Sequence, residues 1–277
     1  MDEVAQFNRE RWNDLVAAKV AYGRAWLDLD VAGARQWLKD HYVLGDMSGK
    51  DVLCLATGGG QQSAIFGLLG ARVTVIDMSD AQLEQDRIAA EHYGLPTLIE
   101  HGDMRDLSRF DDDSFDVVWH AYSINFVPDA KTVWGEVARV IRPGGLYYFE
   151  FSNPYLKGME EADWNGEGYL LKRPYIDGAE VIFEDSSWYL GEQKVKVVGP
   201  REFNHSLSTV VNALVRHGFV IRGLWEYTDG STADLDAEPG SWEHFIAIAP
   251  PYMILVATYE RQKMGGSNWE LGNWVIE

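Results

Sequence analysis

The chain has 277 residues, of which 46% are hydrophobic and 24% charged, the composition of a soluble globular protein with a substantial core. It contains no apolar run near the ~20 residues of a membrane span and no secretory signal, so we expect a cytoplasmic protein without a membrane partner. The formal net charge of −19, with no cluster of Lys and Arg, argues against nucleic acid as a partner.

Residues 1–45 carry aromatic and aliphatic side chains at helical spacing, among them Phe7, Trp12, Leu15 and Trp26. This spacing predicts two amphipathic helices. We interpret residues 1–45 as an N-terminal helical cap on a domain that covers residues 46–260.

From residue 51 short apolar runs alternate with helix-like stretches. Strands joined through helices form right-handed crossovers and a parallel sheet, whose ligands bind beyond the carboxyl ends of the strands. The predicted elements, in chain order, are a strand at 51–55, a helix at 61–70, a strand at 72–77, a helix at 79–94, strands at 96–103 and 114–120, a helix and turn at 129–145, and a strand at 146–152.

Residues 155–200 interrupt this alternation, since they are rich in Gly, Trp, Tyr and acidic residues. We predict an insertion or lid here, with short antiparallel strands at 181–190 and 192–199. A helix at 206–219 and strands at 220–227 and 251–261 follow, and residues 261–277 are a C-terminal tail.

Three glycines, Gly58 to Gly60, follow the strand at 51–55 directly. A dinucleotide fingerprint needs a third glycine after two further residues, but Gln61, Gln62 and Ser63 follow here instead. A Walker phosphate loop needs G-K-[ST], which is also absent. The loop is therefore expected to let a ligand lie against bare backbone.

In this context the sequence resembles the class I S-adenosylmethionine-dependent methyltransferases, clearly over about residues 45–151 and more weakly to about 260. The glycine segment from Cys54 to Gly60 stands where the family has a pattern like D-x-G-x-G-x-G. Four further segments of the family pattern follow in order: the acid in VTVIDMSD, the GD-aliphatic pattern at Gly102, FDVVWHAYSINFVPD and EVARVIRPGGLYYFE. The resemblance implies an α/β Rossmann-like fold with a mostly parallel seven-stranded sheet, an antiparallel last strand and helices on both faces.

The resemblance also assigns residues to the cofactor, S-adenosylmethionine. Asp77, with its neighbour Met78, matches the acid that accepts the ribose hydroxyls, although a carboxylate at a helix start is also stabilised by the helix dipole alone. Asp103 matches the acceptor for the adenine amino group, and Met104 is expected to pack on the ring. Gly58 and Gly60 are expected to expose backbone to the methionine end.

Two positions depart from the family pattern. Cys54 stands where the family usually has an acid, and Ala56 replaces the first glycine. Ala56 is still expected to contact the cofactor. The acid normally helps to hold the cofactor's ammonium, so this contact is expected elsewhere; the amide of Gln62 is one candidate and a solvated helix start is the alternative. As the only cysteine, Cys54 forms no disulfide framework or thiolate metal cluster, and no metal site is expected.

The segment after the fourth strand brings His120 and Ala121 to the place where the family's backbone flanks the cofactor. His120 is the candidate catalytic base, although a histidine at a strand end is also commonly structural. Asn125, Trp188 and His205 are candidate acceptor-binding residues, and aromatic side chains here suit either an apolar acceptor or core packing.

The sequence therefore predicts methyl transfer, by in-line displacement at the sulfonium methyl, to a small-molecule acceptor in a monomer or homodimer. One alternative is an adenosylmethionine-binding regulatory protein without turnover, which the missing acid at Cys54 favours. The other is an NAD-dependent oxidoreductase, against which the absent third glycine argues.

Overall fold

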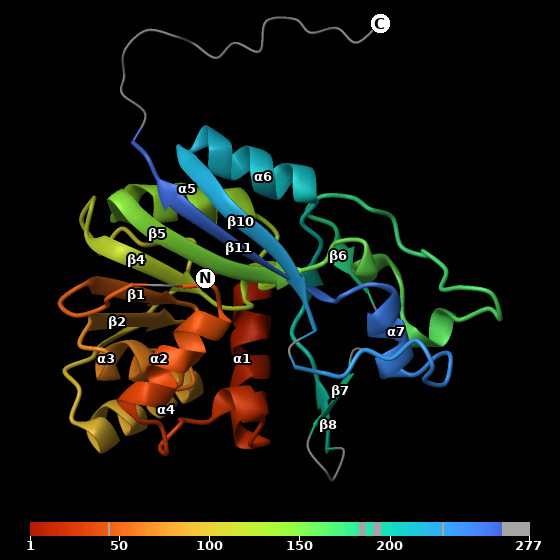
Figure 1. The fold of residues 1–277 in the computed structure, drawn as a ribbon, viewed down its shortest axis with the longest axis horizontal. Helices are drawn as coiled ribbons and strands as arrows, with labels where there is room; N and C mark the ends of the chain where they lie inside the picture. The colour runs from red at the N-terminus through yellow and green to blue at the C-terminus, as the bar shows by residue number, and fades with distance from the viewer. Residues whose placement is uncertain (44, 183–186, 191–194, 229, 262–277) are drawn as a thin grey trace, which may run out of the picture.

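The computed structural model describes residues 1–43, 45–182, 187–190, 195–228 and 230–261. A seven-stranded sheet forms its centre, in the order β10-β11-β5-β4-β1-β2-β3 (Figure 1). The strands are β1 (Asp51–Leu55), β2 (Arg72–Asp77), β3 (Leu98–His101), β4 (Phe115–His120), β5 (Ile141–Ser152), β10 (Phe219–Tyr227) and β11 (Tyr252–Tyr259).

The direction of the strands confirms the predicted fold class. β1 pairs in parallel with β2 and β4, β3 with β2, and β5 with β4. The last strand, β11, runs antiparallel to both β5 and β10. The strand order reverses at β1, so that ligands are expected beyond the carboxyl ends of β1 and its neighbours β2 and β4.

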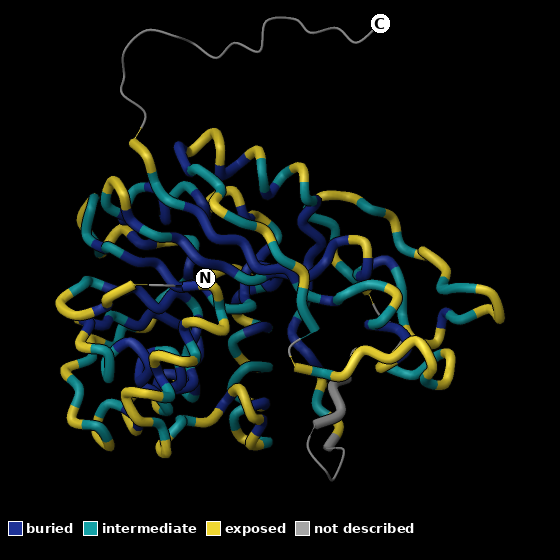
Figure 2. Tube along the Cα trace, in the orientation of Figure 1, coloured by how far each residue is buried: buried dark blue, intermediate teal, exposed yellow. Residues whose placement is uncertain are grey.

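Helices cover both faces of the sheet, and each face carries its own hydrophobic core (Figure 1). β1 shows why, because Leu53 and Leu55 belong to the core with α5 and α6, whereas Val52 and Cys54 belong to the core with α2 and α3. Successive side chains of a strand point to opposite faces, so a continuous apolar run is needed to serve both. The central strands are accordingly buried (Figure 2). The helices are α1 (Glu3–Ala17), α2 (Val31–Asp40), α3 (Gln62–Leu68), α4 (Asp80–Tyr93), α5 (Ala130–Val140), α6 (Leu207–Arg216) and α7 (Trp242–Ile248).

Local signals in the sequence fix several helix ends. The Ser79 hydroxyl accepts a hydrogen bond from the Gln82 N–H at 3.2 Å and caps α4, which ends at Gly94 in the left-handed conformation with φ 65°. The largest boundary difference in the central sheet is at β5, which begins at Ile141 and not at 146, and β3 is shorter than the predicted 96–103. Ile141 pairs with Phe115 before an irregularity in the register, so the turn at 143–145 lies within the strand pairing.

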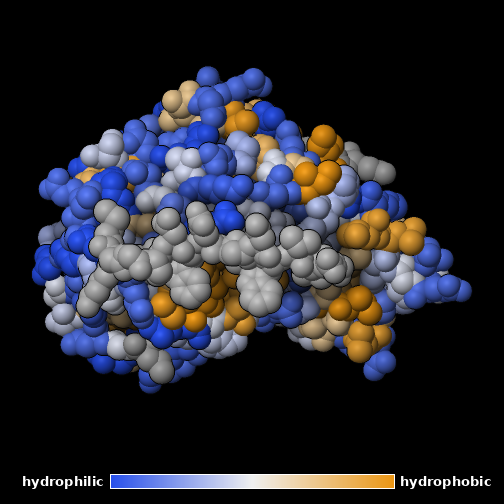
Figure 3. Space-filling model, turned by 90° about the horizontal axis from the view of Figure 1, so that it is seen from above, coloured by the Kyte–Doolittle hydropathy of each residue, from blue (hydrophilic) through white to orange (hydrophobic). Residues whose placement is uncertain are grey.

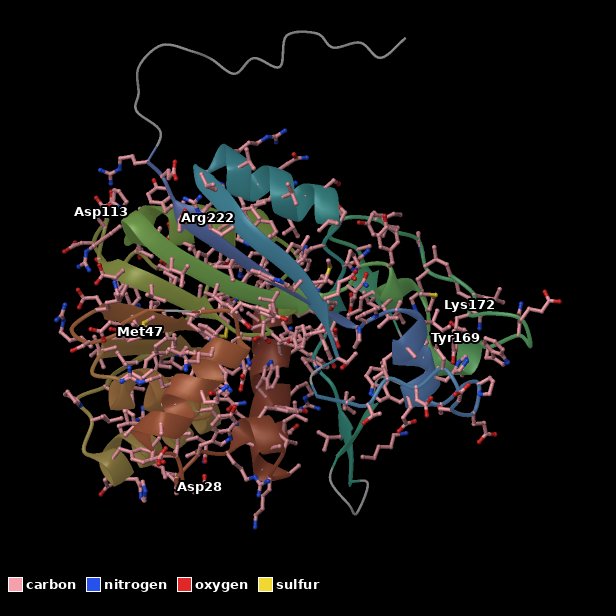
Figure 4. The ribbon with its side chains drawn as sticks, in the orientation of Figure 1. Asp28, Met47, Asp113, Tyr169, Lys172 and Arg222 are labelled. Atoms are coloured by element: carbon pink, nitrogen blue, oxygen red, sulfur yellow. The ribbon has the colours of Figure 1, made fainter. Side chains whose placement is uncertain are left out.

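The segment after β5 forms small sheets of its own. β6 (Glu180–Val181) pairs with β9 (Glu202–Phe203), and β7 (Ser187–Leu190) pairs antiparallel with β8 (Val195–Val198), in agreement with the predicted short antiparallel strands. Tyr169, labelled in Figure 4, lies beside α7, and its hydroxyl is 2.8 Å from Nδ1 of His244. The segment is therefore tied to α7.

The face seen in Figure 3 is largely hydrophilic, with hydrophobic side chains in small groups, as expected for a net charge of −19. Within the described part of the chain, no helix is long and apolar enough to cross a membrane.

Candidate cofactor and acceptor site

The loop between β1 and α3 has an unusual backbone. Ala56, Gly59 and Gly60 adopt positive φ angles of 48°, 120° and 70°. The left-handed region is nearly free of strain for glycine but costs a residue with a Cβ roughly 1–2 kcal/mol. Ala56 therefore holds a strained conformation at the position where the family has glycine.

The glycines in this loop are required by other parts of the chain. A Cβ on Gly58 would lie 2.5 Å from Cβ of Gln82 in α4, and one on Gly60 would lie 2.4 Å from the carbonyl oxygen of Gln85. Gly60 does not line the cavity described below, contrary to the expectation that it faces the ligand. Close packing of the loop on α4 thus explains Gly60, whereas Gly58 both packs on α4 and lines the cavity.

A buried carboxylate that the sequence analysis missed holds the loop in place. Asp86 in α4 accepts hydrogen bonds from the N–H groups of Gly59 and Gly60, each at 3.1 Å, and from the Ser63 hydroxyl at 2.5 Å. Burial raises the pKa of Asp86 to about 7, and the neighbouring Asp77 adds to the rise. No motif marks this residue, because it lies 23 to 27 positions after the residues that it binds.

Asp77 lies at the end of β2, against the loop. Its Oδ2 accepts from the Gly58 N–H at 3.1 Å and its Oδ1 from the Ser79 N–H at 2.8 Å. Burial raises the pKa of this carboxyl, and the backbone hydrogen bonds oppose the rise. The carboxylate is thus oriented by the backbone and borders the cavity.

Asp103 is part of an ion-pair chain that reaches the N-terminal helix. Arg105 donates from Nη2 to Asp103 at 2.6 Å and from Nη1 to Asp2, the N-cap of α1, at 2.6 Å. The hydrogen bond from Arg105 lowers the pKa of Asp2 to about 2. Asp103 and Arg105 both line the cavity, so the start of α1 is fixed at its border.

One cavity of about 1070 Å³ lies at the carboxyl ends of β1, β2, β4 and β5. It brings together residues predicted from widely separated parts of the sequence. The predicted residues that line it are Ala56, Gly58, Gln62, Asp77, Met78, Asp103, Met104 and Ala121.

His120 is not among the residues that line this cavity. The side chain is fully buried, its Nδ1 lies 3.0 Å from the Tyr147 hydroxyl, and its ring stacks near Tyr147 and Phe149 in the core beneath the sheet. Burial lowers the pKa of His120 to about 3. A histidine in this position is neutral and does not line the cavity, so the structure does not support the predicted role of catalytic base.

Asn125 and His205 also have structural partners, and neither lines the cavity. The Asn125 amide donates to the Phe203 carbonyl at 3.2 Å and accepts from the Ser152 N–H at 2.9 Å. Nε2 of His205 lies 3.0 Å from the Val127 carbonyl. The third predicted acceptor-binding residue, Trp188, belongs to β7, but its side chain lies outside what the structure describes.

Other aromatic side chains, of which only Phe126 is indicated by its position in the sequence after the fourth strand, line the far end of the cavity. They come from α1, from the segment after β4, from the strand ends of β10 and β11, and from α7. These residues are Trp12, Tyr122, Phe126, Tyr227, Trp242, Phe245 and Tyr252. The others could not be selected from the sequence, because single aromatic residues at strand and helix ends look the same whether they pack in a core or line a cavity.

The near end of the cavity fits S-adenosylmethionine. The side chain of Gln82 lines the cavity, and its Oε1 is buried without a hydrogen-bond partner among the described residues. A buried polar atom without a partner indicates a missing ligand or water. Together with Asp77 and the half-buried Gly58, which also line the cavity, Gln82 offers hydrogen-bonding groups to a ligand that is rich in hydroxyl and amino groups.

Two further groups bear on the chemistry. Cys54 is fully buried, and burial raises the pKa of its thiol, so that it is a core residue. Among the described residues no cluster of three or more His, Cys, Asp or Glu side chains could hold a metal ion.

Comparison with known proteins places this geometry in a family. Residues 53–149 match a family model described as "Methyltransferase domain". The chain is 36% identical over 188 residues to the protein named "Uncharacterized methyltransferase YbaJ" of Bacillus subtilis (strain 168), which covers 68% of this chain and 72% of that one. It is 33% identical over 138 residues to the demethylmenaquinone methyltransferase of Clavibacter sepedonicus and spans 55% of that protein's length.

The fold is also found among solved structures. A putative S-adenosylmethionine-dependent methyltransferase from Listeria monocytogenes superposes with a TM-score of 0.60 at 20% identity, over 83% of this chain and 98% of that one. The chain therefore belongs to the methyltransferase-domain family and is a class I S-adenosylmethionine-dependent methyltransferase, with S-adenosylmethionine as its cofactor.

Proposed function

We propose that this enzyme methylates a small-molecule acceptor, which binds in the aromatic end of the cavity. The observation that carries the proposal is the continuity of the cavity, which extends from Gly58 and Asp77 to Tyr227 and Trp242 in about 1070 Å³. A volume of this size is in the range of sites that enclose a small ligand.

The residues at the near end are proposed to hold the cofactor, which supplies the methyl group. Asp77 would accept from the ribose hydroxyls, since an ionised carboxylate keeps lone pairs beyond those used by Gly58 and Ser79. Asp103 would accept from the adenine amino group beside Met104, while Arg105 holds its carboxylate in place through a hydrogen bond. Gln82 is added to the predicted set, and His120 is removed from it.

The residues at the far end are proposed to orient the acceptor and to exclude water. Trp12 of α1 packs edge-on against Phe126, with 5.1 Å between ring centroids, so the N-terminal helix forms part of the wall. The segment after β5 adds Leu156, Met159 and Ala162. We accordingly propose residues 1–45 as a cap and the start of the 155–200 insertion as the opposite wall.

Binding and orientation are the contributions that the described residues can make. Among the described residues that line the cavity none is a histidine, and the carboxylates are the groups able to accept a proton. Positioning alone accounts for large rate effects in group transfer.

Two further observations support a small acceptor. The relative from Clavibacter sepedonicus is named for demethylmenaquinone, a small molecule. The net charge of −19 disfavours binding of nucleic acid, whose phosphates need clustered Lys and Arg.

The test is a screen for methyl transfer with radiolabelled S-adenosylmethionine against pooled small metabolites, with proteins and RNA as comparison pools. Transfer that is confined to the small-molecule pools is expected. Transfer to RNA or protein alone, or salt-sensitive submicromolar binding of RNA near physiological ionic strength, would contradict the proposal. Sedimentation analysis of the same preparation decides between the proposed monomer and homodimer.

A further inference from the structure

The far end of the cavity has an unusual charge balance. Among the described residues, four carboxylates line it, those of Glu150, Glu160, Glu161 and Glu202, against one ammonium, that of Lys157. Lys157 forms an ion pair with Glu202, and Arg173 forms one with Glu160. The excess negative charge at this end therefore comes from the two remaining carboxylates.

Glu150 lies on β5, next to the strand that carries Tyr122 toward the cavity. One of its oxygens accepts a hydrogen bond from the Tyr148 hydroxyl at 2.6 Å, and the other accepts from the Tyr227 hydroxyl at 2.8 Å. Both partners are neutral phenols, so these hydrogen bonds fix the orientation of the carboxylate but leave its charge in place. A carboxylate keeps further lone pairs for a ligand after accepting two hydrogen bonds.

The rings of Tyr122, Tyr227 and Tyr252 line the cavity together with this carboxylate, and Tyr227 contacts it directly. The rings of Tyr227 and Tyr252 are 5.4 Å apart and tilted, and Tyr122 meets Tyr252 edge to face at 5.4 Å. Faces of aromatic rings attract cations, and the attraction grows when the site excludes water. Rings and carboxylate together form an environment suited to an ammonium group.

The chain already places an ammonium against one of these rings. Nζ of Lys157 lies 6.0 Å from the centroid of the Tyr122 ring while it is paired with Glu202. At this end of the cavity a tyrosine ring and a carboxylate therefore hold an ammonium together.

We propose that the acceptor carries a cationic nitrogen, an ammonium or substituted amine, which binds between Glu150 and the rings of Tyr122, Tyr227 and Tyr252. This inference rests on the proposed small-molecule function and narrows its substrate class. An anionic acceptor is disfavoured at this position, because it would approach Glu150 with like charge. An uncharged acceptor would leave the charge of Glu150 uncompensated.

Three probes that share a phenyl ring and a short chain test this inference: phenethylamine, 2-phenylethanol and phenylacetate. Binding to the enzyme saturated with S-adenosylhomocysteine is measured by ligand-observed NMR and calorimetry. We expect phenethylamine to bind at least tenfold more tightly than 2-phenylethanol or phenylacetate. Glu150→Gln should reduce this preference to within about threefold and leave the affinity for S-adenosylhomocysteine unchanged.

The matched control is Glu226→Gln, which also removes one carboxylate charge. Glu226 precedes Tyr227 in the chain, but it is exposed and does not line the cavity. It should keep the wild-type preference. Equal binding of the three probes, no binding of phenethylamine at millimolar concentration, or a preference that survives Glu150→Gln would overturn the inference.

The outcome can be separated from that of the proposed function. If the metabolite screen finds transfer only to uncharged or anionic small molecules, the cationic acceptor is wrong and the small-molecule function stands. If transfer occurs only to RNA or protein, both are wrong.

Discussion

The hydroxyl of Ser63, in the first turn of α3, donates a 2.5 Å hydrogen bond to the carboxylate of Asp86 in α4. The same carboxylate accepts from the N–H groups of Gly59 and Gly60. One fully buried acid thus joins the glycine loop, the helix that follows it and the helix of the next crossover. The carboxyl that supports the loop comes from α4, whereas the family's usual acidic position in β1 is occupied by Cys54.

Asp86 is expected to make stability depend on pH. Its pKa is about 7 in the folded protein, against about 3.9 in an unfolded chain. Between these values the folded state binds more protons, so the free energy of unfolding falls as pH rises from about 4 to 7, by up to ~1.4 kcal/mol per pH unit. When urea unfolding is measured at pH 5 and pH 8, the free energy of unfolding should fall less between the two pH values for Asp86→Asn than for the wild type.

Glu84→Gln is the control for this measurement, since Glu84 lies on the same helix and is exposed. It should follow the wild-type dependence. Parallel stability curves for the wild type and Asp86→Asn would contradict the assignment.

Asp77→Ala should weaken binding of S-adenosylmethionine by about 1.5–3 kcal/mol, the scale of hydrogen bonds to a charged group. The reason is the loss of the carboxylate at the end of β2, where the ribose hydroxyls are proposed to bind. Calorimetry gives the affinity and circular dichroism verifies the fold. Asp80→Asn, an exposed acid three residues along the chain, is the control, and unchanged affinity in Asp77→Ala would remove Asp77 from the site.

Ala56→Gly should stabilise the folded protein by about 1 kcal/mol. Ala56 has a φ of 48°, where glycine is free of the strain that a Cβ imposes, although glycine also makes the unfolded chain more flexible. Ala90→Gly within α4 is the matched control and should destabilise by about 1 kcal/mol. Destabilisation in both variants, measured by urea unfolding, would show that the loop does not strain Ala56.

His120→Gln should lower stability without abolishing catalysis. The substitution disturbs a fully buried ring with a hydrogen bond to Tyr147, so thermal unfolding should occur at a lower temperature. Affinity for S-adenosylhomocysteine should stay within a few-fold of the wild type, and turnover of the acceptor found by screening should persist. A loss of turnover by 100-fold in a folded variant would restore His120 as a catalytic residue.

The sequence alone was sufficient for the fold class and for bringing residues of the proposed cofactor end to one cavity. Local patterns predict the alternation of β1, α3, β2 and α4. These patterns are the apolar runs, the helix cap at Ser79 and the helix end at Gly94. In a parallel sheet a strand's carboxyl end determines where the next residues lie, so Gly58, Asp77 and Asp103 could be placed together from their positions after successive strands.

The lining of the proposed acceptor end could be known only from the tertiary structure. Side-chain direction alternates along a strand, and it sends His120 into the core with Tyr147 while Ala121, one residue later, lines the cavity. Asp86 binds residues 23 to 27 positions before it, and Glu150 accepts from Tyr227 of another strand, and no local pattern encodes such pairings. The cofactor end was predictable because it depends on connectivity, whereas the acceptor end depends on which side chains the packing of α1, α7 and the strand ends turns inward.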